Sequence, residues 1–213
     1  IWQGGQEGCR GVLDVLNGTV NPCGKLPDTI ACTPADYPAA DHYGADDRNI
    51  YAEDIYVGYR YFETFAPEKV LYPFGFGLSY TKFEVRLLSA DETADGITAF
   101  AAVQNTGSCP GKEVVQLYCT APQGRLGKPS KVLCAFAKTR MLAHGESQTL
   151  TLKAPWRNFA SYDDSGVTGH KSAFVLEAGE YRFSLGTDVR SAEEAFTVTL
   201  PLMVVEQLES AAA

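Results

Sequence analysis

The alternation of apolar and polar residues after position 82 constrains the fold more than any other feature. Phe83, Val85 and Leu87 are separated by Glu84 and Arg86. A repeat of two is the period of a β-strand with one buried face. The same alternation or short apolar runs predict further strands at 97–104, 113–120, 131–138, 147–153, 173–177, 180–186 and 195–200.

Short turn signals separate these predicted strands, and no helical pattern lies between them. The signals are Asn105-Thr106-Gly107, Pro110-Gly111, His144-Gly145 and Ala178-Gly179. Many short strands joined by such turns are typical of an antiparallel β-sandwich. We therefore expect an all-β sandwich over residues 83–205, followed by a frayed tail at 206–213.

The first 82 residues have a different pattern, which indicates the last part of an α/β domain. Ile1-Trp2 is expected to end a buried strand, and residues 5–16 are expected to form a helix that Gly18 terminates. Residues 55–62 are predicted to form a strand or extended segment. The stretch 72–81 has too much Pro and Gly for regular structure, although its aromatic rings must pack.

Charge and hydropathy exclude several classes of partner. The chain has 18 Lys and Arg against 26 Asp and Glu, which gives a net charge of −8. Because nucleic acids and anionic membranes are bound mainly through Lys and Arg, we expect neither partner. No apolar run approaches the ~18 residues that a membrane span needs. The chain begins with Ile-Trp rather than Met, and we expect it to be a piece of a longer protein.

The cysteines and histidines do not predict a metal or cofactor site. None of the six cysteines forms a C-x-x-C pair, and the three histidines are scattered. Cys119 and Cys134 lie within apolar strand patterns, where a free cysteine behaves as a small hydrophobic residue. We therefore predict free thiols, no cofactor and a reducing, cytoplasmic setting rather than secretion.

Several long motifs resemble glycoside hydrolase family 3. They are W-x-G-G-Q-E-G at 2–8, V-L-N-G-x-V-N-P-C-G-K-L-P at 15–27, Y-A-E-D-I-Y-V-G-Y-R-Y-F at 51–62 and Y-P-F-G-F-G-L-S-Y-T-K-F at 72–83. The family usually has Ser where this chain has Cys23. Residues 103–118 and 174–186 resemble the fibronectin type III-like domain that follows in many members.

This resemblance implies a β-glucosidase-type enzyme that hydrolyses terminal non-reducing β-glycosidic bonds with retention. In the family, a barrel domain supplies the nucleophilic Asp and the α/β domain supplies the acid/base Glu. Neither residue matches a position in this chain, so the resemblance implies no catalytic, substrate-binding or metal residue here. The expected partners are the remainder of the enzyme and, through it, an oligo- or aryl-β-glycoside substrate.

Retaining hydrolysis needs two carboxyl groups about 5–5.5 Å apart. None of the acids in this chain is expected to form such a pair. Glu53 and Asp54 are adjacent, so in an extended segment they point to opposite sides. Asp163 and Asp164 lie in a turn motif, where Asp favours local hydrogen bonds. Glu7 suits a helix terminus. We interpret all five as structural, with Glu53 pairing with Arg60 or capping backbone amides.

Other conspicuous residues also have structural interpretations. His144 precedes a turn glycine with no nucleophile motif nearby, and Gly75 and Gly77 allow close backbone approach rather than phosphate binding. Trp156 is expected to cover one end of the sandwich. The dense aromatic residues are expected to join the α/β segment to the sandwich: Tyr56, Tyr59, Tyr61, Phe62, Tyr72, Phe74, Phe76 and Tyr80.

Two other function classes remain open from the sequence. A stand-alone carbohydrate-binding β-sandwich module requires an exposed aromatic platform. A purely structural, adhesion-type fibronectin domain leaves the W-x-G-G-Q-E and G-K-L-P motifs without a role. We therefore favour a supporting fragment of a glycosidase, with the carbohydrate-binding module as the alternative.

Overall fold

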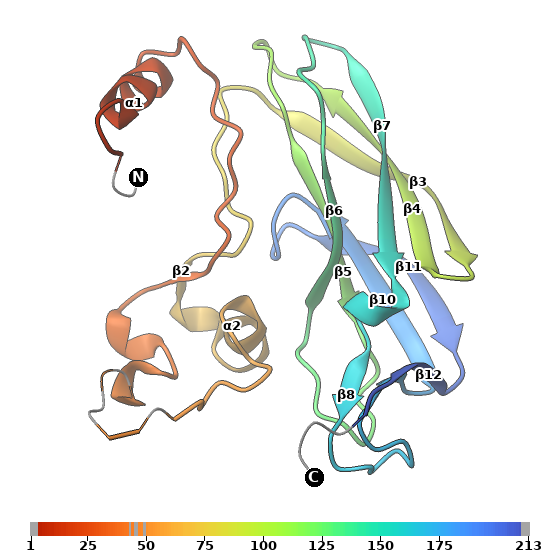
Figure 1. Ribbon diagram of the computed structural model, residues 1–213. Helices are drawn as coiled ribbons and strands as arrows, with labels where there is room; N and C mark the ends of the chain where they lie inside the picture. The colour runs from red at the N-terminus through yellow and green to blue at the C-terminus, as the bar shows by residue number, and fades with distance from the viewer. Residues whose placement is uncertain (1–3, 43, 45–46, 49, 210–213) are drawn as a thin grey trace.

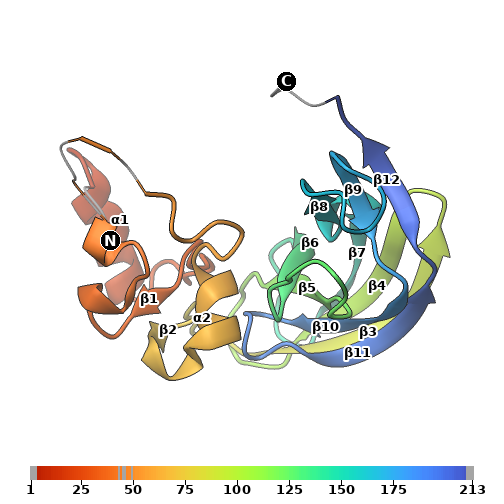
Figure 2. The same cartoon turned by 90° about the horizontal axis from the view of Figure 1, so that it is seen from below.

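The computed structural model describes residues 4–42, 44, 47–48 and 50–209. An N-terminal segment of short helices, turns and two brief strands lies beside a β-sandwich (Figure 1). Viewed along the sandwich, the two parts are side by side, and α2 lies on the side of the N-terminal segment that faces the sandwich (Figure 2). The expected strand at Ile1-Trp2 lies outside the described residues. No helix in the described ranges is long and apolar enough to cross a membrane.

The sandwich begins with β3 and contains three antiparallel sheets. One sheet has the order β3-β4-β7 (Phe83–Thr93, Gly96–Asn105 and Ser147–Pro155). The facing sheet has the order β11-β10-β5-β6 (Glu193–Leu200, Gly179–Gly186, Val114–Thr120 and Val132–Lys138). A small third sheet has the order β12-β9-β8 (Met203–Gln207, Ala173–Leu176 and Ser161–Asp163). The fold class predicted from the alternation is confirmed.

The core of the sandwich follows from the period of two. Along β4, Ile97, Ala99, Ala101 and Val103 are buried at alternate positions. They pack in one cluster with side chains of the facing sheet. Burial of apolar area at roughly 25 cal/mol per Å² makes this cluster the main source of stability.

Trp156 and Phe159 close one end of that core, as expected. Trp156 is 9% exposed, lies in a short 3₁₀ helix (Trp156–Asn158), and belongs to the sandwich cluster. Its indole N–H donates to the carbonyl of Ala94 at 2.9 Å. The bulky ring therefore fills the core while its one polar atom is satisfied.

The described residues of the N-terminal segment form two α-helices and one small sheet. Helix α1 spans Gly8–Leu16, within the predicted 5–16, and β1 (Ile30–Ala31) pairs antiparallel with β2 (Val70–Tyr72). Three 3₁₀ turns complete it, at Pro34–Asp36, Ala40–His42 and Pro67–Lys69. Residues 73–81 are irregular apart from turns, as predicted for 72–81, but Tyr72 belongs to β2.

The predicted strand over 55–62 is wrong, because α2 spans Tyr59–Phe65. Gly58 begins the helix with a φ of 59°, which few other residues adopt. Phe62 is fully buried with Ala31 and Ala66, and its ring meets Tyr37 edge-on at 5.5 Å. This packing outweighs the strand preference of the aromatic residues.

Two details of the sandwich also differ from expectation. The tail predicted at 206–213 is wrong at its start, because Glu206 and Gln207 belong to β12 and pair with β9. The turn around Asp163 contains the short strand β8, which the sequence pattern misses because it is only three residues long. Both elements belong to the small third sheet.

Candidate functional site

The N-terminal segment and the sandwich meet along a hydrogen-bonded seam. We use "seam" for the contacts that residues 4–82 make with strands β5 and β6, with their flanking loops, and with the loop between β10 and β11. Tyr59 and Phe74 pack against a small buried cluster that includes Tyr118 and Val189. Because the segment covers it, β5 is buried on both faces, and Gln116 and Tyr118 are 3% and 0% exposed.

Polar contacts fasten the seam along its length. The backbone N–H of Leu133 donates to the Tyr59 hydroxyl at 2.9 Å, and the N–H of Val189 donates to the Phe74 carbonyl at 3.1 Å. Further bonds and ion pairs join Asn21 to Pro110, Lys25 to Glu113, Cys23 to Lys138, Glu63 to Arg190, and both Glu63 and Thr64 to Ser130. These contacts hold the two parts in one arrangement.

The expected close approach of the glycine-rich segment is present. A Cβ on Gly75, whose φ is +83°, would lie 2.6 Å from the side-chain nitrogen of Gln116 and 2.9 Å from the Cα of Asp188. At Gly77 a Cβ would lie 2.5 Å from the carbonyl of Gly24. Both glycines therefore let the backbone pass close to its neighbours.

The aromatic residues divide between the seam and the N-terminal segment itself. Tyr59 and Phe74 lie at the seam, as expected. The others pair mainly within the segment or with α1, so the expectation that all eight join the two parts is too broad. These pairs are Tyr56 with Phe65, Tyr61 with Phe62, Tyr72 with Phe76, and the Tyr80 hydroxyl with the Val15 carbonyl.

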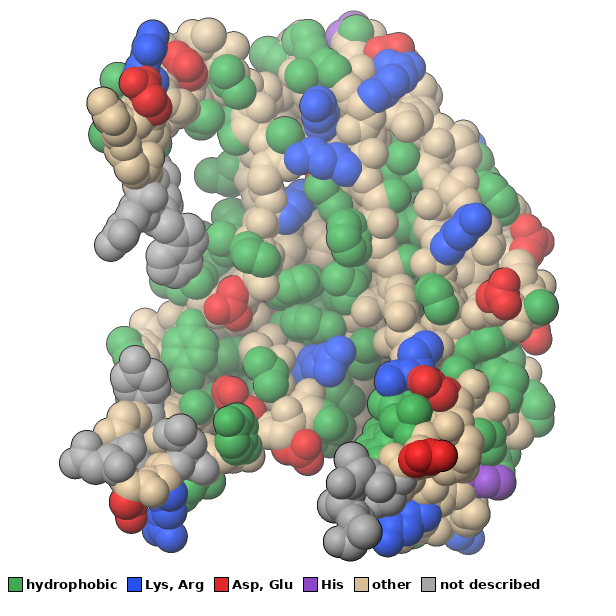
Figure 3. All heavy atoms as spheres, in the orientation of Figure 1, with side chains coloured by type: hydrophobic (Ala, Val, Ile, Leu, Met, Phe, Trp, Pro, Cys, Tyr) green, Lys and Arg blue, Asp and Glu red, His purple; other side chains and the backbone are tan. Residues whose placement is uncertain are grey.

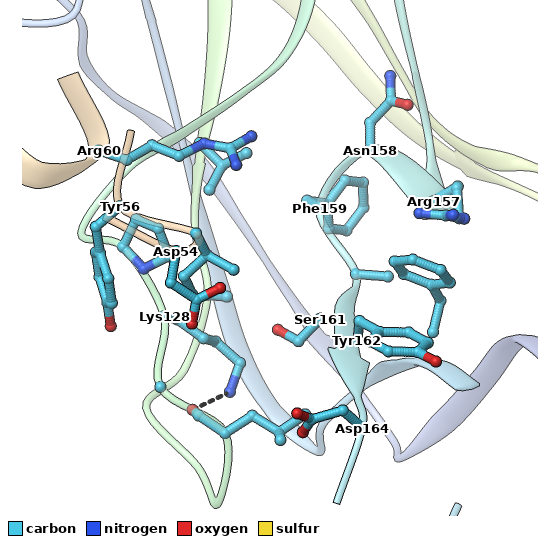
Figure 4. A pocket seen from close by; sticks show the side chains of 18 residues that line it. Asp54, Tyr56, Arg60, Lys128, Arg157, Asn158, Phe159, Ser161, Tyr162 and Asp164 are labelled. Carbon is cyan, nitrogen blue, oxygen red and sulfur yellow. Dashed lines mark hydrogen bonds between the residues drawn. The ribbon is translucent and has the colours of Figure 1, made fainter. Parts of the chain in front are cut away.

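A groove of about 480 Å³ opens beside the seam, and its size suits a small-molecule site. One wall comes from the loop before α2 and from α2, with Asp54, Tyr56 and Arg60. The opposite wall comes from β8 and the segment before it, with Tyr162 and other residues (Figure 4). The loop between β5 and β6 forms the floor with Leu126, Gly127, Lys128 and Pro129.

A buried ion pair fixes the floor of this groove. The Lys128 ammonium, 4% exposed, bonds the carboxylate of Glu177 and the carbonyl of Leu126. Glu177 also accepts the backbone N–H groups of Arg125 and Leu126. Burial raises the pKa of Glu177, but the Lys128 and backbone hydrogen bonds outweigh it and lower the pKa. The loop is therefore held against the end of β9.

Stacked side chains fix one wall of the groove. The Tyr162 and Phe174 rings lie 5.0 Å apart at 43°, and the guanidinium of Arg157 lies over Phe174 at 2.9 Å. Arg157 also pairs with Glu206 of β12 at 2.7 Å. These contacts orient Tyr162 while leaving it 43% exposed.

Asp163 holds the loop that follows β8. Its carboxylate is buried and accepts bonds from the backbone N–H groups of Gly166, Val167 and Thr168 and from the hydroxyls of Ser165 and Thr168. Burial raises its pKa, but the bonds from Thr168 and its neighbours prevail and lower the pKa well below the ordinary range. The turn predicted for Asp163 is present, and its role is structural.

The other acids of interest do not form a buried couple. Asp54 and Asp164, far apart in sequence, lie on opposite sides of the groove, a juxtaposition the sequence did not predict (Figure 4). Both are exposed, so neither has the burial that keeps a glycosidase's proton donor protonated. Among the described residues, Glu53 makes no ion pair with Arg60.

The remaining singled-out residues have local contacts. Glu7 is exposed at the start of α1, 3.4 Å from Arg10. His144 Nδ1 is 2.8 Å from the Gly107 carbonyl. All six cysteines are free, and burial raises the pKa of the Cys134 thiol to about 12. The described ranges contain no group of three or more His, Cys, Asp or Glu side chains suited to a metal.

Comparisons with known proteins match both parts of the chain. The profile of the glycosyl hydrolase family 3 C-terminal domain matches residues 1–80, and that of a fibronectin type III-like domain matches residues 113–189. A β-glucosidase of Ruminococcus albus is 55% identical over 214 residues, covering 100% of this chain. Residues 1–80 are a glycosyl hydrolase family 3 C-terminal domain.

Solved β-glucosidase structures superpose on all or most of the chain. A β-glucosidase from Paenibacillus barengoltzii matches 100% of it with a TM-score of 0.95 and 55% identity. The β-glucosidase 3B of Thermotoga neapolitana, solved with glucose, matches 92% with a TM-score of 0.82 and 39% identity. The chain spans only about a quarter of these relatives: 22% of the R. albus enzyme, 24% of the first structure and 27% of the second.

Proposed function

We infer that this chain is the C-terminal part of a retaining β-glucosidase-type hydrolase that cleaves terminal non-reducing β-glycosidic bonds. Its role is to dock and support the domains that carry the catalytic couple, which lies outside these 213 residues. The main support is structural: the entire chain superposes on about a quarter of the Paenibacillus barengoltzii β-glucosidase with a TM-score of 0.95. The reducing, cytoplasmic setting stays a prediction.

Exposed apolar side chains on the N-terminal segment support this role. Leu13 and Leu16 of α1 are 60% and 71% exposed, although the helix has a strongly one-sided apolar pattern. Leu71, Leu78 and Tyr80 are also exposed, and hydrophobic side chains are visible along this part of the surface (Figure 3). An apolar helix face in an α/β domain packs on a sheet. The rest of that domain is the proposed cover.

The proposal separates the behaviour of this chain from that of the full-length enzyme. Leu16→Glu should leave the unfolding midpoint of the 213-residue chain almost unchanged, because the side chain is already exposed. In the full-length enzyme the same change should lower the midpoint and the hydrolysis of an aryl β-glucoside, because a charge is buried at a domain contact. Equal, negligible effects in both proteins would refute this docking role.

A further inference from the structure

The groove beside the seam has features of a carbohydrate site that the supporting role does not use. It combines an exposed aromatic ring, polar side chains and a buried ammonium in a volume of about 480 Å³. We propose that it binds a neutral β-linked oligosaccharide. This inference rests on the proposed function, because that function supplies the class of ligand.

Several polar side chains that line the groove are uncommitted, meaning that they have no hydrogen-bond or ion-pair partner among the described residues. In the described part of the chain, no hydrogen bond or ion pair involves the side chains of Asp54, Arg60, Ser161, Tyr162 or Asp164. All five line the groove. Carboxylates accept hydrogen bonds and a guanidinium donates several, so together they suit a ligand with many hydroxyl groups.

The groove also contains an aromatic ring whose orientation is fixed by its neighbours. Tyr162 is 43% exposed and is held by Phe174, which Arg157 covers. A ring fixed in this way can stack on the C–H face of a sugar without losing conformational freedom. Tyr56 on the opposite wall adds a second aromatic side chain (Figure 4). The aromatic platform of a carbohydrate-binding module is therefore in place.

The mixture of charges in the groove selects against anionic and apolar ligands. Lys128 and Arg157 are paired with Glu177 and Glu206 respectively. The uncommitted charges are then the cation of Arg60 and the anions of Asp54 and Asp164. An anionic ligand would meet two carboxylates, and an apolar one would leave these polar groups without partners. A neutral polyhydroxylated ligand satisfies donors and acceptors on both walls.

To test this, the 213-residue chain is titrated with cellotetraose, and binding is monitored through the backbone amide chemical shifts in NMR spectra. We expect saturable changes concentrated at residues 54–60 and 157–164. Tyr162→Ala should weaken binding about tenfold, because the stacking surface is lost. Tyr72→Ala is the matched control: Tyr72 is also 43% exposed and pairs with Phe76 at 5.1 Å and 47°. It should leave affinity unchanged.

Three outcomes would overturn the inference: no saturable shift, equal weakening by both tyrosine variants, or loss of binding at this groove in the full-length enzyme. The last would identify the groove as a contact with the rest of the enzyme. Binding is measured without turnover, so its failure leaves the proposed supporting function intact. Conversely, hydrolysis by the chain alone would contradict the proposed function whether or not the sugar binds here.

Discussion

The Tyr59 hydroxyl in α2 accepts a 2.9 Å hydrogen bond from the backbone N–H of Leu133 in β6. The same ring lies 4.6 Å from Phe74 and 6.2 Å from Tyr118, centroid to centroid. One side chain thus joins the helix, the glycine-rich segment and the outer face of β5. The seam thus combines ring packing and a backbone hydrogen bond at one side chain.

Tyr59→Phe should destabilise the chain by about 1–2 kcal/mol, because a partly buried N–H loses its acceptor while the ring packing is kept. Chemical denaturation gives the free energy of unfolding, and hydrogen exchange should show less protection at the Leu133 amide. Tyr51→Phe is the control, since Tyr51 is 90% exposed and should change neither quantity. Unaltered exchange at Leu133 in the Tyr59 variant would contradict this account of the seam.

Gly75→Ala should lower the unfolding midpoint more than Gly145→Ala. Both glycines have positive φ, +83° and +78°, so both substitutions carry similar backbone strain. Only at Gly75 would the new Cβ press on Gln116 and Asp188, whereas nothing lies within 4 Å at Gly145. Thermal unfolding of the two variants gives the comparison. Equal midpoints would show that close approach at Gly75 does not constrain the seam.

Asp163 should make the free energy of unfolding of the sandwich decrease at acidic pH. Its pKa is lowered in the folded chain, so its contribution is complete above the ordinary Asp value near 4 and falls as pH drops toward the folded value. Asp163→Asn should therefore flatten the loss of stability as the pH falls below about 4, and reduce stability near neutrality. Asp164→Asn, at an exposed position, should leave the stability near neutrality unchanged.

Residues 83–207 should fold without the N-terminal segment, but with a lower unfolding midpoint. The sandwich cluster lies within this range, whereas Tyr118 and Val189 lose their cover from Tyr59 and Phe74. Circular dichroism and thermal unfolding test the proposed domain division at 82/83. Ending at 207 rather than 205 keeps the β12 pairing with β9. A spectrum without β-structure would place the boundary elsewhere.

The two larger sheets of the sandwich were predictable because most of their strands show a local pattern of alternating or continuous apolar residues. Ile97, Ala99, Ala101 and Val103 alternate with less buried neighbours, and that period is visible in the sequence alone. Helix α2 was not, because its aromatic residues favour a strand and its helical state depends on burying Phe62 against Tyr37. Such tertiary contacts leave no local periodic signal.

The groove could not be derived from the sequence for a related reason. Asp54 and Asp164 are each unremarkable in their own segments, and only the seam brings both walls to one place. Tyr162 and Trp156 lie six positions apart, and no local pattern shows that the structure exposes the first and buries the second. The sequence feature that could have indicated a groove is the high density of aromatic residues. That density indicates packing in a core as readily as ligand binding.

Cleavage of the glycosidic bond should require carboxyl groups that lie outside this chain. The direct measurement is release of p-nitrophenol from an aryl β-glucoside by the purified 213-residue chain, beside the full-length enzyme. We predict turnover by the full-length enzyme and none above background by the chain. Turnover by the chain that Asp54→Asn or Asp164→Asn abolishes, while Glu53→Gln retains it, would place the catalytic couple in the groove and contradict the account.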